Sequence, residues 1–580
     1  MAHQALAMSG TADSQRASQF DSLDQALSVL SRRKDTFAQL SVTQKLELLR
    51  QCKANLQDVA LQWVSSLCEV KGLPLDSPLA AEEWWSPYHV NRHLTLVIET
   101  LEDIDRYGKP KPDLSQATIT NGRLRQQVIP SDFYDSLLFG VLYGVKAEVV
   151  FRPGITAEQA RAKQASFYQQ SSPSGAVNLI LGAGNVSSIP VMDVLTKMFN
   201  EGQVCILKMN PVNEACGPAL EQMLKPLIDQ GYVRIVYGGG DVGAYLCQHE
   251  TVDEIHITGS EHTHDLIVWG PPGPERDRRK AANEPLLAKK ITSELGNVTP
   301  MVVVPSKYTK KQLQFQARNV AMMLTNNASF NCIAGKMLVM SRHWPQRAEF
   351  IGMIREILRN TAPRKAYYPG AQRRYEKLTE GRNLEQIGQA KDGELPWTLI
   401  AGLDANNQSE PLFQIEPFCA LLSFVELDAA DPVAFMKSAT EFCNETLWGQ
   451  LGATVIVPPS IERHPTTAQA LALMLDELRY GAIGVNQWSA VNYSLGVTPW
   501  GSFPDNTLQD IGSGIGFVHN TPMFEGLEKS ISRASIVPVR LPPWMLGHNH
   551  AHVAAKHCVN FENDRSILTL VKAALAGIRG

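Results

Sequence analysis

From residue 173 onward, short apolar runs alternate with longer amphipathic stretches, and this alternation constrains the fold of the 580-residue chain more than any other feature. The apolar runs predict strands at Ala176–Leu181, Val204–Lys208, Val233–Tyr237 and Glu254–Thr258. The stretches between them predict helices at Val191–Phe199, Ala215–Gln230 and Gly243–His249. Strand–helix alternation is typical of a parallel sheet with helices on both faces. Because the same texture recurs after residue 300, we predict an α/β protein with two parallel-sheet domains.

The two ends of the chain predict further helices. Residues 22–70 have a helical pattern, and Ser41 with Gln44 has the spacing of a capping box at a helix start. Near the carboxyl end, Ile567–Ile578 predicts a short final helix that packs against the body. The proline- and arginine-rich run Gly270–Lys280 has the composition of a loop, and we expect a solvated insertion there.

Composition excludes several classes of protein. A net charge of −4 gives no general basic surface, so nucleic acid is not an expected partner. Apolar runs such as Leu137–Val145 are far shorter than the roughly 18 residues of a membrane span. Met1–Phe20 contains no continuous apolar segment, so we expect no secretory signal. The nine scattered cysteines include no CxxC pair, which predicts free thiols, no metal site and a cytoplasmic location.

Cys332 is the first candidate for chemistry, because it lies in the run of small and polar residues Asn326–Lys336. Such a run suits a loop or helix start that exposes sulfur to a cleft. A thiol with a pKa of about 8.5 is only slightly ionised at neutral pH, so a nucleophilic cysteine needs surroundings that favour the thiolate. A lone cysteine is more often a small buried hydrophobe. The catalytic interpretation therefore depends on distant partners.

Three such partners stand at predicted strand ends or in short motifs. Asn185 follows the strand at Ala176–Leu181, and its amide N–H could stabilise an oxyanion at the carboxyl end of the sheet. Glu294 follows the strand-like run before it and could act as a general base on water. Glu416 supplies a second carboxylate. Taken singly, a turn asparagine and a surface glutamate explain these residues as well. Together with Cys332 they suggest thiol attack on a carbonyl.

Two features point to a nucleotide. Lys208 ends a predicted strand, where a lysine is well placed for a nucleotide, although a solvated strand-end lysine fits equally. Gly259 and Ser260 follow another strand and precede a helical run. A turn of this kind at a helix N-terminus can bind an anion.

With these motifs in order, the chain resembles the aldehyde dehydrogenase superfamily from about residue 173 to 490. The matching motifs are Pro173-x-Gly175 with Asn185, Val204–Lys208, Val252–Ser260, Glu294–Gly296, Cys332 and Glu416–Phe418. The resemblance implies a Rossmann-like cofactor domain, a catalytic domain and a small oligomerisation element. It places N-terminal helices and the dinucleotide domain in 1–300, with a possible bridging segment near 135–172. The catalytic domain would span 301–505, and a C-terminal extension 506–580.

The resemblance also implies a function: NAD- or NADP-dependent oxidation of a small-molecule aldehyde to a carboxylic acid, by a homodimer or homotetramer. Cys332 would form a thiohemiacetal and then a thioester, with Asn185 holding the oxyanion and Glu294 activating water. Lys208 would contact the adenosine ribose, and the turn at Gly259 and Ser260 the pyrophosphate. The motif containing Glu416 and Phe418 would contact the nicotinamide ribose.

Departures from the family pattern leave alternatives open. The family's lysine motif continues to a glutamate, which Lys208–Pro211 lacks, so the choice between NAD and NADP stays open. His264 replaces a common glycine, and the chain after residue 500 resembles the family little. Trp488, Tyr493 and Trp500 could form an aromatic substrate wall or simply pack in the core. A CoA-acylating enzyme and a catalytically silent binding protein remain the alternative functions.

Overall fold

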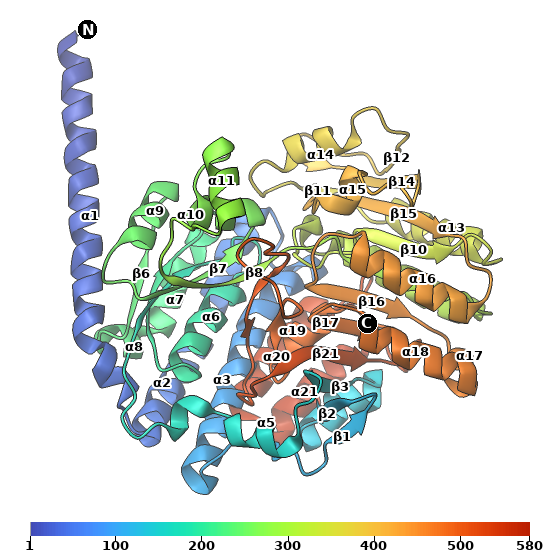
Figure 1. The fold of residues 1–580 in the computed structure, drawn as a ribbon, viewed down its shortest axis with the longest axis horizontal. Coiled ribbons are helices and arrows are strands. Elements are labelled where there is room, and N and C mark those ends of the chain that lie inside the picture. Colours follow the sequence, from blue (N-terminus) through green and yellow to red (C-terminus); the bar gives the residue numbers. More distant parts are fainter. Residues whose placement is uncertain (1, 580) are drawn as a thin grey trace.

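Two sheets organise the molecule in the computed structural model, which describes residues 2–579, with side chains from residue 20 onward (Figure 1). Within that range, six strands form the first sheet in the order β19-β8-β7-β4-β5-β6. All are parallel except the edge strand β19. They are β4 (Val177–Leu181), β5 (Val204–Lys208), β6 (Val233–Val236), β7 (Glu254–Gly259), β8 (Lys290–Leu295) and β19 (Gly514–Ile515). The predicted strands and the parallel sheet are confirmed.

Helices cover both faces of this first sheet (Figure 1). They are α6 (Ser188–Phe199), η4 (Pro211–Cys216), α7 (Gly217–Met223), α8 (Lys225–Asp229), α9 (Gly240–Gln248), α10 (Glu261–Trp269) and α11 (Pro274–Ala282). The single helix predicted at Ala215–Gln230 is wrong in detail. It breaks at Leu224, whose backbone leaves the helical region just before Pro226, a residue with no N–H to donate.

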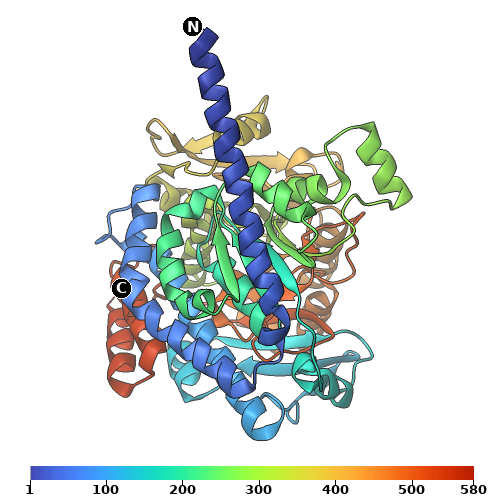
Figure 2. The same cartoon turned by 90° about the vertical axis from the view of Figure 1, so that its left-hand side faces the viewer.

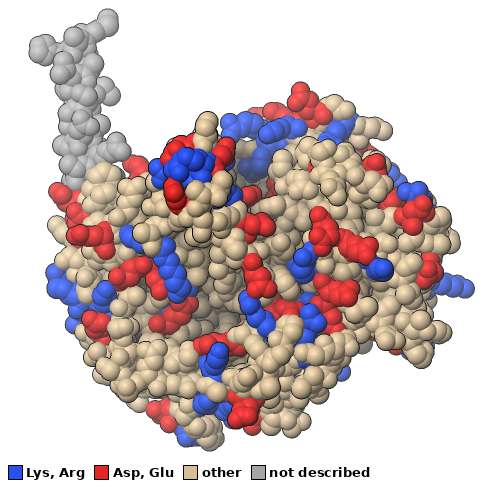
Figure 3. Space-filling view, in the orientation of Figure 1, with Lys and Arg blue, Asp and Glu red and all other residues tan. Residues whose placement is uncertain are grey.

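The loop predicted at Gly270–Lys280 is also wrong, because most of it forms helix α11. Pro274 occupies the first helical turn, where a missing N–H costs nothing. Glu275 then forms ion pairs with Arg278 at 3.0 Å and Arg279 at 2.8 Å, one turn along the helix. Acidic and basic side chains accordingly crowd together over this exposed helix (Figure 3).

The second sheet is larger and mixed. In the described part of the chain its eleven strands run β1-β2-β3-β21-β17-β16-β9-β10-β15-β14-β12. The seven from β21 to β14 are parallel, and antiparallel strands close both edges. They are β1 (Thr118–Thr120), β2 (Arg123–Ile129), β3 (Lys146–Phe151), β9 (Pro300–Val303), β10 (Met337–Ser341), β12 (Glu385–Ile387), β14 (Trp397–Leu403), β15 (Leu421–Leu427), β16 (Gly452–Ile456), β17 (Ala482–Val485) and β21 (Leu527–Arg533).

Shorter elements connect these strands. The helices are η1 (Pro78–Ala80), α4 (Phe133–Asp135), η2 (Ser136–Val141), α5 (Ala157–Lys163), η3 (Ser166–Gln169), α12 (Lys310–Thr325), η5 (Asn326–Ser329), α13 (Arg347–Arg359), α14 (Ala371–Thr379), α15 (Pro411–Gln414), α16 (Pro432–Glu445), α17 (Pro459–Arg463), α18 (Pro465–Glu477) and α19 (Ala490–Leu495). Two small ladders pair β11 (Arg364–Lys365) with β13 (Glu394–Leu395), and β18 (Trp500–Gly501) with β20 (Phe517–Val518).

Three N-terminal helices pack beside the first sheet: α1 (Ala2–Ala38), α2 (Val42–Lys71) and α3 (Ala81–Tyr107) (Figures 1 and 2). The predicted capping box starts α2, with the Gln44 N–H donating to Ser41 Oγ at 3.2 Å and the Ser41 N–H to Gln44 Oε1 at 3.0 Å. Gly72 ends α2 in a left-handed conformation, φ 67°. Lys71, the last residue of α2, is buried.

Of the two C-terminal helices, α20 (Ala551–Asp564) packs against α3, and the predicted α21 (Ile567–Ile578) packs against α20. A buried ion network ties α20 to α3. The Arg92 guanidinium pairs with Glu562 at 3.1 Å and with Asp135 at 3.0 Å, and all three side chains are at most 1% exposed. The described chain contains no helix long and apolar enough to cross a membrane.

Candidate active site

Cys332 lies where two cavities meet. One cavity has a volume of about 180 Å³ and the other about 940 Å³, and Asn185, Ile189 and Cys332 line both. All nine cysteines fall within the described residues, and only Cys332 and Cys558 are less than fully buried. Cys332 therefore differs from a buried structural cysteine in being open to two spaces at once.

The chain just before Cys332 is held in a strained conformation. Asn327, Ala328 and Ser329 have φ values of 52°, 52° and 74°, three consecutive non-glycine residues in the left-handed region. Such a conformation persists only where the surroundings enforce it. Lys336 supplies part of that restraint, since its Nζ donates to the carbonyl of Ser329 at 3.2 Å and to that of Cys419 at 2.7 Å.

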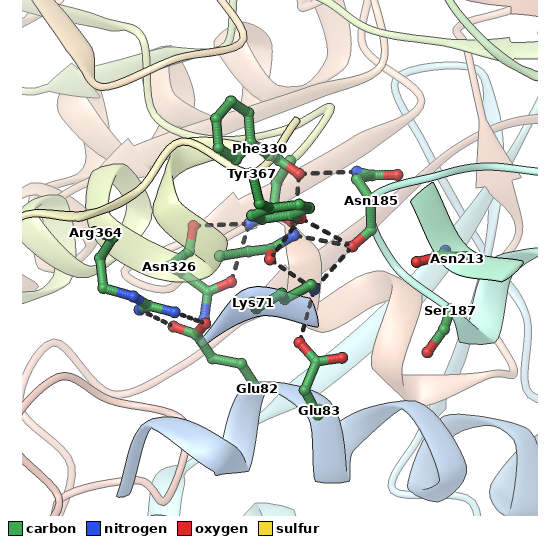
Figure 4. A network of polar contacts seen from close by, with 12 residues as sticks. Lys71, Glu82, Glu83, Asn185, Ser187, Asn213, Asn326, Phe330, Arg364 and Tyr367 are labelled. Carbon is green, nitrogen blue, oxygen red and sulfur yellow. Dashed lines mark hydrogen bonds and ion pairs between the residues drawn. The ribbon is translucent and has the colours of Figure 1, made fainter. Parts of the chain in front are cut away.

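Asn327 supplies the rest through a buried polar network. Figure 4 shows this network around Lys71, Asn185 and Tyr367. The Nδ2 atom of Asn327 donates to the carbonyls of Asn185 at 3.0 Å and Phe330 at 3.1 Å. Its Oδ1 accepts from Lys71 Nζ at 3.0 Å and from the Tyr367 hydroxyl at 2.9 Å. The network thus joins the backbone of Asn185 to the loop that carries Cys332.

Lys71 is the buried charge in this network (Figure 4). Its Nζ pairs with Glu83 at 2.7 Å and donates to the carbonyl of Asn185 at 3.3 Å. Burial disfavours the ammonium, but the neighbouring Glu83 carboxylate outweighs it, so the pKa of Lys71 is raised. Helices α2 and α3 therefore supply a fixed, charged brace beneath the candidate site.

Asn185 comes from the loop between β4 and α6. One N–H of its side-chain amide donates to the Phe330 carbonyl at 3.0 Å. An amide nitrogen carries two protons, so the second can serve an oxygen bound beside Cys332. The position, 6% exposed at the meeting of both cavities, suits an oxyanion donor.

Glu294 lies near the end of β8, in the wall of the larger cavity that Cys332 also lines. Its carboxylate is buried, and the Cys332 thiol and Trp500 indole lie close to it without forming a hydrogen bond of ordinary geometry. Burial raises the pKa of Glu294 to about 8, with the charge of Asp193 adding to the effect and the Cys332 thiol and Trp500 indole partly offsetting it. A carboxylate in this state is a stronger base than an exposed one.

The same burial acts on the nucleophile candidate. Burial first, and then the charges of Glu294 and Glu416, hold the pKa of the Cys332 thiol well above its usual range. The resting thiol therefore keeps its proton. The thiol must lose that proton before sulfur can attack.

The larger cavity opens at the carboxyl ends of β4, β5 and β7, where open parallel sheets bind nucleotides. Lys208 lies in its wall at the end of β5, and burial lowers the pKa of this lysine. Gly259 ends β7, and Ser260 caps α10, its Oγ accepting from the Thr263 N–H at 3.2 Å. A volume near 940 Å³ is within the range of about 300–1,000 Å³ for ligand sites.

Glu416 and Phe418 line the other part of this cavity. Glu416 Oε1 is buried with no partner in the described structure, and burial raises the pKa of its carboxyl to about 8. An unpartnered carboxylate oxygen suits a hydroxyl donor such as a ribose. Gly296 of the Glu-Leu-Gly motif leaves room for Glu416, since a Cβ at this position would overlap the Glu416 carboxylate. NAD or NADP thus fits the donors and acceptors present.

Sequence reasoning missed the residues that brace the site: Lys71, Glu83, Asn327, Lys336 and Tyr367. Only Asn327 carried a local signal, since asparagine tolerates the left-handed region better than most residues. The others act across 256 residues (Lys71 to Asn327) or 83 residues (Lys336 to Cys419), separations that no motif spacing reveals. Within the described side chains, no cluster of histidine, cysteine and carboxylate residues could hold a metal ion.

The fold and the site together define a two-sheet α/β protein with a reactive-cysteine candidate between a nucleotide-sized cavity and a smaller one. Residues 147–361 match the model of the aldehyde dehydrogenase family. That match covers 215 of the 580 residues, and over this part the chain is similar to the aldehyde dehydrogenase family. The resemblance noted in the sequence is confirmed. No curated protein sequence matches the chain.

Solved structures share the fold at low sequence identity. Glyceraldehyde-3-phosphate dehydrogenase GapN from Methanocaldococcus jannaschii, complexed with NADP, has a TM-score of 0.58 and 14% identity, over 88% of this chain and 93% of that one. An NAD-dependent aldehyde dehydrogenase from Sinorhizobium meliloti has 0.58 and 16%, over 90% and 88%. AldC from Pseudomonas syringae, a mutant complexed with NAD⁺ and octanal, has 0.57 and 14%, over 90% of each chain.

Proposed function

We propose that this protein oxidises an aldehyde to a carboxylic acid, with NAD or NADP as the hydride acceptor. The observation that carries the proposal is the meeting of Asn185, Glu294 and Cys332 in one wall of the larger cavity. Asn185 and Cys332 also line the smaller cavity. A substrate carbonyl at Cys332 can therefore reach both a nucleotide and a separate space for its own chain.

The first step is addition of sulfur to the aldehyde carbon. The Cys332 thiol gives up its proton to solvent, and its sulfur forms a C–S bond to the aldehyde carbon to give a thiohemiacetal. The carbonyl oxygen gains negative charge as this bond forms. The free N–H of the Asn185 amide and the Cys332 backbone N–H hold that charge, and one such donor contributes about 10²–10³ in rate.

Oxidation then converts the thiohemiacetal to a thioester on Cys332. NAD or NADP, when bound, supplies the acceptor for the hydride that leaves the aldehyde carbon. Lys208, Gly259 and Ser260 would hold the adenosine and phosphate groups, and Glu416 with Phe418 the nicotinamide ribose. The loop braced by Asn327 keeps sulfur in place while the carbon changes geometry.

Hydrolysis completes the cycle. Glu294 takes a proton from water, the hydroxyl oxygen adds to the thioester carbon, and the C–S bond breaks to return the Cys332 thiolate. The buried carboxylate of Glu294 favours this hydrolytic step over transfer to CoA, which requires no such base. The intact set of catalytic candidates argues against a silent binding protein.

The experiment is an assay of the purified full chain with a panel of aldehydes, NAD or NADP, and with or without CoA. We expect reduced cofactor and free acid without CoA, and no activity in Cys332→Ala. Cys443→Ala is the matched control, because this buried cysteine lines neither cavity. Strict dependence on CoA, or full activity of Cys332→Ala, would refute the proposal.

Assembly and location belong to the same proposal. We expect a homodimer or homotetramer in the cytoplasm, with residues 1–300, 301–505 and 506–580 as its N-terminal and dinucleotide-binding, catalytic and C-terminal parts. Light scattering on the purified chain measures the assembly directly. A strictly monomeric active enzyme would contradict this expectation.

A further inference from the structure

The smaller cavity lies on the far side of Cys332 from the cofactor cavity, and its walls are mostly apolar. Aromatic side chains line part of the cavity, among them Trp85, Tyr88, Trp488, Tyr493 and Trp500. Aliphatic side chains from η2, α19 and α21 add to the apolar lining, and polar side chains such as Lys71, Glu83 and Asn331 line the remainder. The sequence left open whether Trp488, Tyr493 and Trp500 form a substrate wall or pack in the core. They do both, since all three are at most 8% exposed and line this cavity.

The cavity offers no unpaired charge to a substrate. Among the described residues that line it, the carboxylates and the ammonium are already paired: Lys71 with Glu83, and Glu82 with Arg364 at 3.0 Å. Burial lowers the pKa of His89 to about 3, so that ring stays neutral. A substrate with a phosphate or a carboxylate at its far end would bury that charge without a partner, at a prohibitive cost.

The far wall comes from the C-terminal extension, outside the family match at 147–361. Ala573 and Ala574 of α21 line the cavity, with Cys558 of α20 beside them. These helices are fixed in position, because Arg92 ties Glu562 of α20 to α3 and His548 Nε2 lies 3.0 Å from the Gly577 carbonyl oxygen. The wall is therefore rigid, and small side chains set its depth.

We propose that this cavity binds the unbranched alkyl chain of the aldehyde, and that α21 sets the longest chain that fits. This inference rests on the proposed function, since the chain enters the cavity from a carbonyl at Cys332. A cavity of about 150 Å³ lined by apolar side chains accommodates benzene. The volume of about 180 Å³ here therefore suits a chain of about six to eight carbons.

The wild-type enzyme should show this preference in its chain-length profile. Each methylene buried in an apolar site contributes enough to raise kcat/KM about fourfold. We expect kcat/KM to rise from propanal to about octanal and then to level off. The eight-carbon aldehyde that ends in a carboxylate should react at least about a hundredfold more slowly than octanal.

Two variants move the wall in opposite directions. Ala574→Trp fills the cavity and should lower kcat/KM for octanal at least about tenfold, while propanal stays within about twofold. Leu142→Ala deepens the cavity and should shift the preferred chain to a greater length. Leu575→Trp is the matched control, because it adds the same bulk one residue along α21 on a face that is 51% exposed. We expect its profile to equal the wild type.

Binding without catalysis separates this inference from the proposed function. Octan-1-ol should quench or shift tryptophan fluorescence in the wild type and in Leu575→Trp, and Ala574→Trp should weaken its affinity at least about tenfold. If no aldehyde is oxidised but octan-1-ol binds in this pattern, the proposed function fails and the alkyl site stands. If aldehydes are oxidised with a flat chain-length profile, or Ala574→Trp affects propanal and octanal equally, the alkyl site is refuted.

Discussion

The two cavities that meet at Cys332 are built in different ways. The larger one is lined by residues at the carboxyl ends of neighbouring parallel strands, so Lys208, Gly259 and Ser260 each follow or end an apolar run. The smaller one collects side chains from α3, η2, α19, α20 and α21, elements separated by hundreds of residues. The difference teaches that sheet topology alone can position the residues of the proposed cofactor site, whereas packing among distant helices shapes the proposed substrate site.

The largest expected effect falls on the junction itself. Cys332→Ala should lower the turnover of every aldehyde at least about a thousandfold, because no other group can form the thioester. The variant should still bind NAD or NADP, since the sulfur is one atom in a large cavity wall. Calorimetry with NAD or NADP tests whether the cofactor still binds, and absorbance at 340 nm measures the loss of turnover. Loss of cofactor binding would show that the two cavities are not separable at Cys332.

Next comes Glu294→Gln, which removes the base but keeps the shape of the wall. We expect one equivalent of reduced cofactor in a rapid burst, followed by turnover slowed about 10²–10⁴-fold. Stopped-flow absorbance resolves the burst from the steady state. A proportional loss of both phases would assign Glu294 to acylation rather than to hydrolysis.

The buried brace from α2 and α3 should give a mixed effect. Lys71→Met leaves Glu83 buried without its partner, so the free energy of unfolding should fall by about 3–5 kcal/mol. Turnover should fall about tenfold with KM for cofactor unchanged, because Lys71 contacts the Asn185 carbonyl and Asn327 but not the larger cavity.

The control for that variant is the double change Lys71→Met with Glu83→Leu, which removes both charges. It should recover most of the unfolding free energy in urea titrations and little of the turnover. If the double variant recovers both the free energy of unfolding and the turnover, Lys71 and Glu83 stabilise the fold but do not position Asn185.

The smallest effect is a pH dependence. Since burial raises the pKa of Glu294 to about 8, its basic form is scarce below that pH and dominant above it. Thioester hydrolysis should therefore accelerate as pH rises through about 8 and then level off. Single-turnover hydrolysis from pH 6 to 10 measures this, and Glu294→Gln should show a flat profile. A wild-type rate independent of pH would contradict the raised pKa.

Much of the fold followed from local patterns. The strands at β4, β5 and β7, the Ser41 capping box and the helix at Ile567–Ile578 all depend on neighbouring residues, and the structure agrees with them. Helix α11 was missed because its composition suggests a loop, while Pro274 and the Glu275 ion pairs stabilise a helix.

The site residues also fall into two groups: those that the sequence reveals and those that only the folded chain reveals. Asn185, Glu294 and Cys332 could be singled out because each carries its own chemistry and follows a strand or a polar run. Lys71 and Tyr367 could not, because their importance lies in contacts with Asn327 that only the folded chain creates. Likewise, no pattern in Ala573 or Ala574 indicates that α21 closes a cavity.

The central claim is that Cys332 carries the acyl group at the junction of the two cavities. The most direct measurement is mass spectrometry of Glu294→Gln after one turnover with octanal and NAD or NADP. We predict a mass increase equal to one octanoyl group, on the peptide that contains Cys332 and absent in the Cys332→Ala, Glu294→Gln double variant. An unmodified Cys332 after a full burst, or an octanoyl group on another residue, would contradict the claim.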